Sequence, residues 1–264
     1  MPQRLRFPLK KKIPEISISI VSHGHGELVA LLLADLKKYC PTSIEVILTL
    51  NVKETLSFTQ EDFDFQIHQI HNKKQKGFGT NHNHALKHAR GSFVCVLNPD
   101  VRLTCDPFPK LIDCLDDKKV GVAAPAIKNR NGEFQENGRQ FPTPLSLLKK
   151  ILSRAKIGHK KINFPIGVDN IYPDWVSGAF MVFPHGVYRQ IGGFNEKYFL
   201  YYEDVDLCAR LNRMGLKTVL CPAVSALHDG RYDSHRNIKF LKWHMTSALR
   251  FFLSDFLIKN VKPK

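Results

Sequence analysis

Short apolar runs separated by polar and glycine-bearing stretches recur along the chain, in a pattern typical of alternating strands and helices. Runs rich in β-branched residues predict strands at 16–21, 43–50, 65–70, 93–97, 120–127 and 217–222. Helical spacing of apolar residues predicts helices at 28–36, 80–89, 107–115 and 237–258. This order indicates an α/β protein whose Rossmann-like, mostly parallel central sheet is flanked by helices, with an amphipathic helix near the C-terminus.

The run at 93–97 has consecutive apolar residues, as in a strand that is covered on both faces. Pro99 cannot donate a hydrogen bond to a neighbouring strand, so we expect the strand to end there and to place Asp100 at its carboxyl end. Open α/β sheets bind ligands at that edge. A carboxylate there suits Mg²⁺ or Mn²⁺, which join one or two carboxylates to substrate phosphates. The alternative is that Asn98, Pro99 and Asp100 form an ordinary turn.

Glycines interrupt the pattern at three places that are candidates for ligand approach. The stretch at 22–26 has the sequence Ser-His-Gly-His-Gly, and the lysine-rich stretch at 73–79 also contains glycine; each leads into a predicted helix. Backbone N–H groups there can face a phosphate or a base, although such glycines often serve turn geometry alone. Ser177-Gly178 breaks the apolar run at 175–183, and a glycine within a strand often marks a close approach. The chain has no GxGxxG fingerprint, so a dinucleotide is not implied.

Acidic residues gather once next to aromatic ones. Glu203, Asp204 and Asp206 follow the aromatic cluster at 199–202. Apolar surroundings raise carboxylate pKa values, which makes one of the three a candidate general base. The alternative is that acids at a helix start interact with the helix dipole. His228 follows the last apolar run and is a candidate ligand, although a lone histidine is more often structural.

The chain of 264 residues carries 39 Lys and Arg against 24 Asp and Glu, a formal net charge of +15. This charge favours anionic partners: nucleic acid, phosphorylated substrates or an anionic membrane surface. No nucleic-acid-binding motif is present and the basic stretches are scattered, so no nucleic acid partner is expected. Basic amphipathic segments at 145–161 and 237–258 are candidates for contact with anionic lipid or a phosphorylated acceptor; a solvated face and packing on the domain are the alternatives. The apolar residues expected on one face of the second segment are Leu241, Met245, Leu249, Phe252 and Phe256.

The six cysteines form no CxxC pair, so a zinc ribbon is not expected, and we interpret them as free thiols of a reducing compartment. The chain shows no signal-peptide core and no run of about 18 apolar residues. We therefore expect a cytoplasmic protein that lies, if on a membrane at all, peripherally at the inner face of the plasma membrane. The predicted division is a basic tail at 1–14, a main α/β domain at 15–235 and a basic amphipathic helix at 236–264.

The order of motifs along the chain also resembles a known family. The motifs are Gly77-Phe78-Gly79 with Asn83, Leu97-Asn98-Pro99-Asp100, Ser177-Gly178-Ala179, Gly192-Gly193-Phe194, Tyr202-Glu203-Asp204-Val205-Asp206-Leu207 and His228. In this order and spacing the chain resembles glycosyltransferase family 2 enzymes of GT-A fold, most of all the rhamnosyltransferase-like bacterial branch that builds surface polysaccharides. The resemblance covers residues 16–256 and implies that 15–235 is a GT-A glycosyltransferase domain.

The resemblance implies a role for each matching position. Asp100 matches the metal-binding carboxylate of the family's DXD-like element, and His228 matches the histidine that completes the metal site. Glu203 and Asp204 match the family's acidic pair, with Asp204 as the expected base. The positions expected to line the nucleotide or the sugars, besides Asp100, are Ser22, His23, Asn51, Lys76, Gly77, Asn83, Asn98, Ser177 and Gly178.

Three positions depart from the family pattern. Asn98 replaces the first acid of a full DXD, so metal binding rests more on Asp100 and on the diphosphate. Leu50 stands where many relatives carry an acid beside Asn51, which weakens any inference about the nucleotide base. The His-Gly-His turn at 23–25 differs from the aromatic-Asn turn common in the family.

The implied activity is inverting transfer of a sugar from a nucleotide-sugar donor to a saccharide acceptor, in bacterial surface polysaccharide or lipopolysaccharide synthesis, with Mg²⁺ or Mn²⁺ as cofactor. The resemblance makes dTDP-rhamnose the first expected donor and a UDP-hexose the second, and the basic surface fits a lipid-linked or lipopolysaccharide-core saccharide as acceptor. Three alternatives stay open: a nucleotidyltransferase of related fold, which would release pyrophosphate; a basic nucleic-acid-binding protein; and a non-catalytic scaffold in which Asn98 marks a degenerate site.

Overall fold

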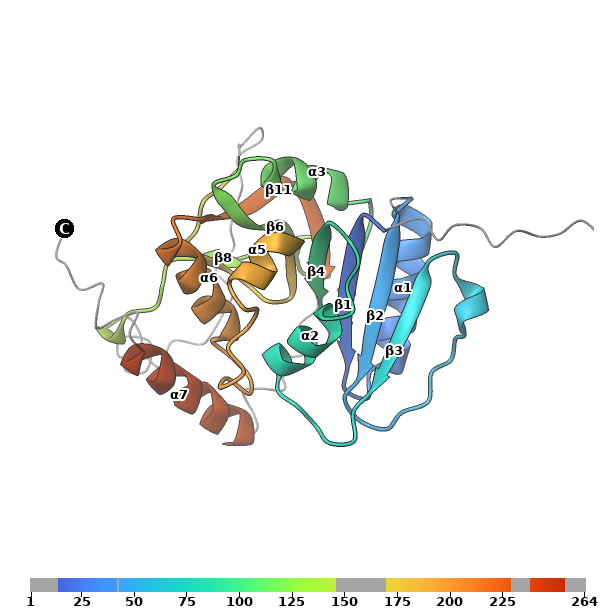
Figure 1. Cartoon of the computed structure of the whole chain (residues 1–264), viewed down its shortest axis with the longest axis horizontal. Coiled ribbons are helices and arrows are strands. Elements are labelled where there is room, and N and C mark those ends of the chain that lie inside the picture. The colour runs from blue at the N-terminus through green and yellow to red at the C-terminus, as the bar shows by residue number, and fades with distance from the viewer. Residues whose placement is uncertain (1–13, 42, 146–169, 229–237, 255–264) are drawn as a thin grey trace, which may run out of the picture.

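The computed structural model describes residues 14–41, 43–145, 170–228 and 238–254. Within these residues, nine strands form one sheet in the order β3-β2-β1-β4-β10-β6-β11-β5, with β7 paired to β6. Helices lie on both sides of this sheet (Figure 1). The α/β class predicted from the sequence is confirmed.

One half of the sheet is parallel, as the sequence predicts. Its strands are β1 (Ile16–Ser22), β2 (Ile44–Leu50), β3 (Gln66–His71) and β4 (Phe93–Leu97). β1 pairs in parallel with both β2 and β4, and β2 pairs in parallel with β3. The carboxyl ends of these four strands therefore meet at one edge of the sheet.

The other half is mixed. β10 (Phe180–Pro184) runs antiparallel to both of its neighbours, β4 and β6 (Val120–Lys128). β11 (Lys217–His228) is parallel to β6 and pairs at its end with the short antiparallel strand β5 (Val101–Arg102). The remaining strands are β7 (Phe134–Gln135), β8 (Gly138–Arg139) and β9 (Trp175–Val176), of which β8 and β9 form a separate two-stranded sheet.

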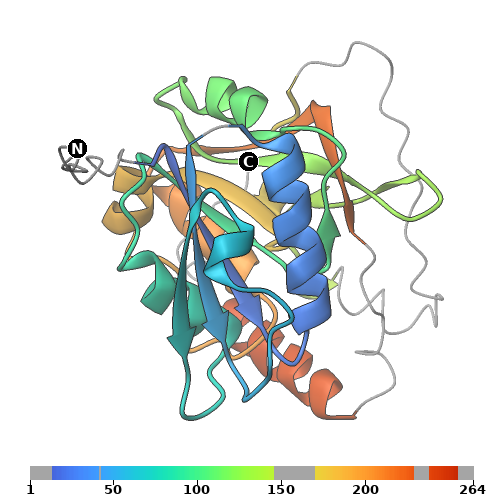
Figure 2. The same cartoon turned by 90° about the vertical axis from the view of Figure 1, so that its right-hand side faces the viewer.

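The alternation of isoleucine and serine in β1 explains how the two faces are covered. Its three isoleucines are fully buried in a cluster with α1 (Gly26–Tyr39) and α3 (Phe108–Leu115). Ser17 and Ser19 are buried on the opposite face, where Ser17 Oγ donates to Glu45 Oε1 at 2.6 Å and Ser19 Oγ lies 2.8 Å from His82 Nδ1. The helices on that second face are α2 (Phe78–Leu86), α5 (His185–Gln190) and α6 (Glu203–Arg213). Figure 2 shows α1 lying along the other side of the sheet.

Two differences from the predicted elements affect the site. β11 continues beyond the predicted end at Pro222 and reaches His228, through an irregularity in its register between Cys221 and Ser225. The apolar run at 175–183 is two strands, β9 and β10, joined by the Ser-Gly-Ala turn. A single 3-10 turn, Gln60–Asp62, precedes β3.

The C-terminal helix α7 (Ile238–Leu253) begins close to the predicted position. Residues 1–13, the basic segment at 146–161 and the predicted helix beyond 254 lie outside the described residues. The division at 14 and 235 stays a prediction. Across the described ranges, every helix is too short or too polar to span a bilayer.

Candidate active site

Asp100 and His228 lie side by side at the end of the sheet. β5 begins at Val101, directly after Asp100, and pairs with the last residues of β11, so that Val101 and His228 are register partners. His228 Nε2 lies 3.2 Å from Asp100 Oδ1. That oxygen is buried and accepts no hydrogen bond of normal geometry. The sequence predicted these two residues as members of one site, and the structure brings them together.

This pair fits a divalent cation. A carboxylate oxygen and an imidazole nitrogen are both ligands of divalent metals, and a buried oxygen without a hydrogen bond is costly unless another partner compensates. Among the described residues, no group of three or more His, Cys, Asp and Glu side chains could hold a metal ion alone. Mg²⁺ commonly keeps few protein ligands and completes its shell with water and substrate phosphates. Asp100 and His228 are therefore suited to hold a cation together with a phosphorylated substrate.

Two consecutive tyrosines in an unusual backbone conformation precede α6. The φ angles are 69° at Tyr201 and 67° at Tyr202. Side-chain-bearing residues seldom adopt this left-handed region, which costs on the order of 1–3 kcal/mol each and persists only where the surrounding structure enforces it. The bend starts α6 at Glu203, so the acidic pair lies at the N-terminus of that helix.

Asp204 is held in place by backbone N–H groups. The N–H of Gly178 donates to Oδ2 at 3.0 Å, and the N–H of Val205 donates to Oδ1 at 2.8 Å. A Cβ on Gly178 would lie 3.3 Å from the ring of Phe78 and 3.6 Å from Asp204 Cβ, so the absence of a side chain allows this approach. Burial raises the pKa of Asp204, while the hydrogen bonds from Gly178 and Val205 act in the opposite direction.

Glu203 has a different environment from its neighbour. Its side chain is buried, and its Oε2 has no hydrogen-bond partner. Burial, and then the adjacent charge of Asp204, raise the pKa of Glu203 well above its usual value. This contrast favours Asp204 as the ionised member of the pair.

Backbone hydrogen bonds connect the surroundings of Asp204 with the strand end that leads to Asp100. The N–H of Asn98 donates to the carbonyl of Ala179 at 2.9 Å, and the N–H of Ala179 donates to Ser177 Oγ at 3.3 Å. The turn at 177–179 therefore lies between Asp204 on one side and, on the other, the end of β4, which leads to Asp100. The structure brings five predicted positions, at 98, 100, 177, 178 and 204, into one part of the sheet edge.

A second polar network lies at the carboxyl ends of β1 and β2. Asn51 Nδ2 donates to the carbonyl of Lys76 at 3.0 Å, and Asn51 Oδ1 accepts from the N–H of Lys76 at 2.9 Å. The same Nδ2 lies 3.1 Å from His23 Nδ1, and the N–H of Asn51 donates to the carbonyl of Ser22 at 2.9 Å. Four predicted positions are thus neighbours, and their contact with a nucleotide stays a prediction.

Two further asparagines belong to this network: Asn81, which lies within the segment at 76–83 that the resemblance matches to the nucleotide, and Asn72, which was not a predicted position. Asn72 Nδ2 donates to Asn51 Oδ1 at 2.9 Å and to Asn81 Oδ1 at 2.7 Å, and Asn81 Nδ2 donates to the carbonyl of Lys76 at 3.1 Å. Both positions carried a usable signal. Asn72 follows the end of a predicted parallel strand, and Asn81 lies in the first turn of the helix after the glycine-bearing stretch.

The glycines and Asn83 of α2 hold the segment that leads into α6. A Cβ on Gly77 would lie 2.7 Å from the carbonyl oxygen of Phe199, and a Cβ on Gly79 would lie 2.5 Å from Phe194 Cβ. Asn83 Nδ2 donates to the carbonyl of Phe194, and its Oδ1 accepts from the N–H of Phe194, both at 2.8 Å. These contacts are structural, and a nucleotide contact by Gly77 or Asn83 stays a prediction.

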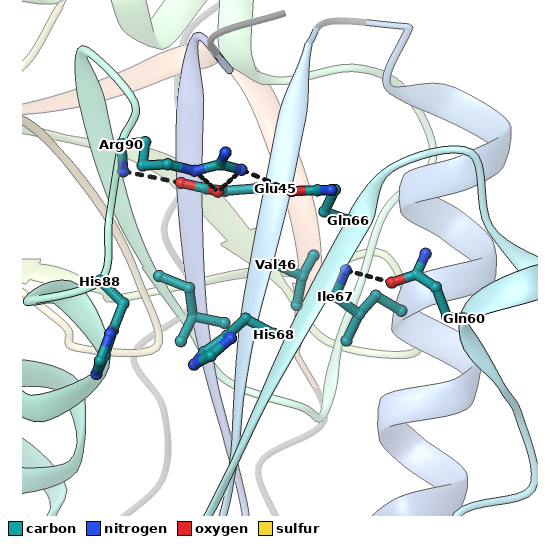
Figure 3. A pocket seen from close by; sticks show the side chains of 9 residues that line it. Glu45, Val46, Gln60, Gln66, Ile67, His68, His88 and Arg90 are labelled. Carbon is teal, nitrogen blue, oxygen red and sulfur yellow. Dashed lines mark hydrogen bonds and ion pairs between the residues drawn. The ribbon is translucent and has the colours of Figure 1, made fainter. Parts of the chain in front are cut away.

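A hollow of about 350 Å³ lies elsewhere, at the opposite ends of the parallel strands (Figure 3). Its polar wall is formed by Glu45 near the start of β2, Gln66 at the start of β3 and Arg90 before β4. Glu45 accepts hydrogen bonds from the guanidinium and the N–H of Arg90, so its charge is compensated inside the protein. None of the predicted site residues lines this hollow, and we place the active site at the carboxyl edge instead.

A parallel Rossmann-like half with polar networks at its carboxyl edge, a residue pair that fits a divalent cation and a carboxylate fixed by backbone groups are typical of a glycosyltransferase. The model of the family described as glycosyltransferase like family 2 matches residues 14–244, and the chain belongs to that family. The resemblance inferred from the motifs is thereby confirmed.

Named relatives agree with this assignment. Rhamnosyltransferase WbbL of Escherichia coli (strain K12) is 25% identical over 259 residues, which cover 93% of this chain and 95% of that protein. The N-acetylglucosaminyl-diphospho-decaprenol L-rhamnosyltransferase of Mycobacterium tuberculosis (strain CDC 1551 / Oshkosh) is 29% identical over 155 residues, 55% of this chain and 49% of that protein.

A solved structure shows the same fold. The crystal structure of GalNAc-T7 with UDP, GalNAc and Mn²⁺ superposes with a TM-score of 0.63 at 12% identity, covering 84% of this chain and 45% of that chain. At this identity the likeness establishes the fold alone, and it confirms the GT-A architecture.

Proposed function

We propose that this glycosyltransferase moves rhamnose from dTDP-rhamnose to a lipid-linked saccharide at the inner face of the plasma membrane, with inversion at the anomeric carbon. The observation that carries the proposal is the position of Asp204, held by the N–H groups of Gly178 and Val205 and connected through the turn at 177–179 to the strand end that bears Asp100. The names of the two rhamnosyltransferases support the donor, and the decaprenol-linked substrate in the second name supports a lipid-linked acceptor. A UDP-hexose is the second candidate donor.

The chemistry follows from which bonds form and break. The acceptor hydroxyl oxygen attacks the anomeric carbon from the face opposite the leaving group, and the bond from that carbon to the diphosphate oxygen breaks with its electron pair. Asp204 accepts the hydroxyl proton as the new bond forms. A single displacement with one base inverts the anomeric centre, by the same geometric logic as in inverting glycosidases.

The environment of Asp204 suits a base. Its raised pKa makes the carboxylate a better proton acceptor, while its two backbone hydrogen bonds fix its orientation. Glu203, whose pKa is raised further by burial and by Asp204, keeps its proton and adds no second negative charge at the reacting centre.

Asp100 and His228 would hold Mg²⁺ or Mn²⁺ against the donor diphosphate. When bound, the cation compensates the negative charge that develops on the leaving diphosphate. The solved GalNAc-T7 complex with UDP and Mn²⁺ supports this choice of cofactor.

A donor panel tests the proposal. Purified full chain, Mn²⁺ and a polyprenyl-diphosphate-linked sugar are incubated with dTDP-rhamnose, UDP-glucose, UDP-galactose or a UDP-N-acetylhexosamine, and the product is analysed by mass spectrometry and NMR. We expect transfer from dTDP-rhamnose, release of dTDP and an anomeric configuration opposite to that of the donor. Transfer from a UDP-sugar alone would replace the donor assignment, retention of configuration would contradict the mechanism, and pyrophosphate release from a nucleoside triphosphate would favour a nucleotidyltransferase.

A further inference from the structure

One face of α7 fixes the helix to the molecule beside the candidate active site. Ala248 and Phe251 are fully buried in a cluster with Tyr202, and Ser247 Oγ donates to the carbonyl of Leu200 at 2.9 Å. The ring of His244 lies 5.4 Å from that of Tyr202. The helix is therefore attached to the segment that leads into α6 and its acidic pair.

The opposite face of α7 is apolar and exposed. Its residues follow each other at intervals of four and form one stripe: Leu241 is 60% exposed, Met245 45%, Leu249 60% and Leu253 67%. This corrects the expected face, because Phe252 packs against the buried cluster and Leu253 takes its place in the stripe. Phe256 lies outside the described residues. Contiguous exposed apolar surface of this kind marks a docking surface.

The charge around the stripe indicates what covers it. The sequence of α7 contains Lys239, Lys242 and Arg250 and no Asp or Glu, and the guanidinium of Arg250 donates to the carbonyl of Lys197 within the protein. Lys242 is exposed next to Leu241. Two copies of this helix face to face would bring like charges together, whereas an anionic bilayer offers acyl chains to the stripe and negative headgroups to Lys242. In Figure 1, α7 lies at the outside of the molecule, away from the parallel half of the sheet.

We propose that α7 docks the protein on the surface of anionic lipid bilayers, with Leu241, Met245, Leu249 and Leu253 at the boundary of headgroups and acyl chains and Lys242 among the headgroups. In this orientation α7 lies between the bilayer and the segment at 200–204 that leads to the candidate base, because that segment packs on the other face of the helix. The inference concerns lipid binding and does not depend on which sugar is transferred.

Vesicle co-sedimentation of the full chain tests it, with phosphatidylcholine vesicles that contain or lack phosphatidylglycerol and no polyprenyl lipid. We expect binding to the anionic vesicles that weakens with salt. Because the double variant Leu241→Gln/Leu249→Gln loses the apolar burial of two leucine side chains, it should bind at least about tenfold more weakly. Lys242→Glu should weaken binding at least about fivefold, because one basic residue contributes about 1 kcal/mol at such a surface.

Leu31→Gln is the matched control, since Leu31 is a 45% exposed leucine on α1, on the other part of the molecule. It should bind vesicles like the wild type, and thermal unfolding of each variant verifies that it folds. Equal binding by the double variant and the Leu31→Gln control would overturn the proposal, because attraction by charge alone would then explain the result. A second result would also overturn it: the wild type does not bind vesicles but forms a dimer, seen by light scattering, and the double variant does not form that dimer. Donor binding is measured separately by calorimetry, so failure to dock and failure of the proposed sugar transfer are told apart.

Discussion

Glu203 and Asp204 are adjacent residues with different chemistry, and the difference comes from their hydrogen bonds. Both are affected by burial, which raises their pKa values. Asp204 receives the N–H groups of Gly178 and Val205, which stabilise its ionised form, whereas Glu203 Oε2 has no partner and the adjacent charge of Asp204 adds to the rise in the pKa of Glu203. At the scale of single residues, the two left-handed tyrosines before the pair set this arrangement, because they direct the chain into α6 so that Asp204 meets Gly178.

A buried histidine next to this region gives a prediction about pH. His82 is 1% exposed and contacts the ring of Phe78 at 4.5 Å, and burial lowers its pKa to about 3. In the unfolded chain a histidine takes up a proton near its usual pKa of 6.5, so acid favours unfolding. The free energy of unfolding should therefore fall by up to about 1.4 kcal/mol per pH unit below that value, through this residue alone.

Urea unfolding of the wild type and of His82→Gln at several pH values checks this. The contribution of His82 is present above the unfolded pKa and is lost as the pH falls, so the difference in stability between wild type and variant should shrink between pH 6.5 and 4. A difference that stays constant over this range would show that His82 is protonated equally in both states.

At the scale of elements, the sequence predicts the parallel half well and the mixed half poorly. The consecutive apolar residues of β4 and the glycine-bearing helix starts identify β1 to β4 because these signals are local. Pro222 suggests the end of a strand, yet β11 passes through it at a register irregularity, which is one of the places where a sheet tolerates proline. The position of His228 beside Asp100 depends on that irregularity and on β5, a two-residue strand. Nothing local in the sequence encodes either feature.

Asn83 attaches α2 to the segment before α6. Asn83 Oδ1 accepts from Tyr188 Oη and from the N–H of Phe194, and Asn83 Nδ2 donates to the carbonyl of Phe194. Asn83→Ala leaves several of these buried groups unpaired and should lower the free energy of unfolding by about 1–3 kcal/mol. It should also speed proteolysis within 192–202. Denaturant unfolding and limited proteolysis measure the two effects.

Tyr188→Phe serves as the comparison, because it removes one of these hydrogen bonds and keeps the ring. It should cost about 1 kcal/mol. If Asn83→Ala proves no more harmful than Tyr188→Phe, then Asn83 does not hold the two elements together.

At the scale of the whole molecule, a donor that contacts both the Asn51 network and the Asp100–His228 pair would connect the two halves of the sheet. A ligand that binds only the folded protein raises its stability by about 2.7 kcal/mol at 100 times its Kd. We therefore expect dTDP-rhamnose with Mn²⁺ to raise the Tm, and chelation of the metal to remove most of that rise. Asp100→Ala and His228→Ala should lose the metal-dependent part.

Asp113→Ala is the control for this experiment, since Asp113 is an exposed aspartate on α3 that pairs only with Lys110 among the described residues. It should keep the full metal-dependent rise in Tm. If Asp100→Ala and His228→Ala both keep the metal-dependent rise in Tm, then these two residues do not form the metal site.

Single-turnover transfer by Asp204→Asn tests whether Asp204 removes the acceptor proton. The amide keeps the shape of the side chain but cannot accept the proton, and loss of general-base catalysis typically costs about 10²–10⁴-fold in rate. We predict a loss of this size in the chemical step, with donor affinity close to that of the wild type and an unchanged fold. Transfer by Asp204→Asn at the wild-type rate would contradict the account and assign the proton to another group.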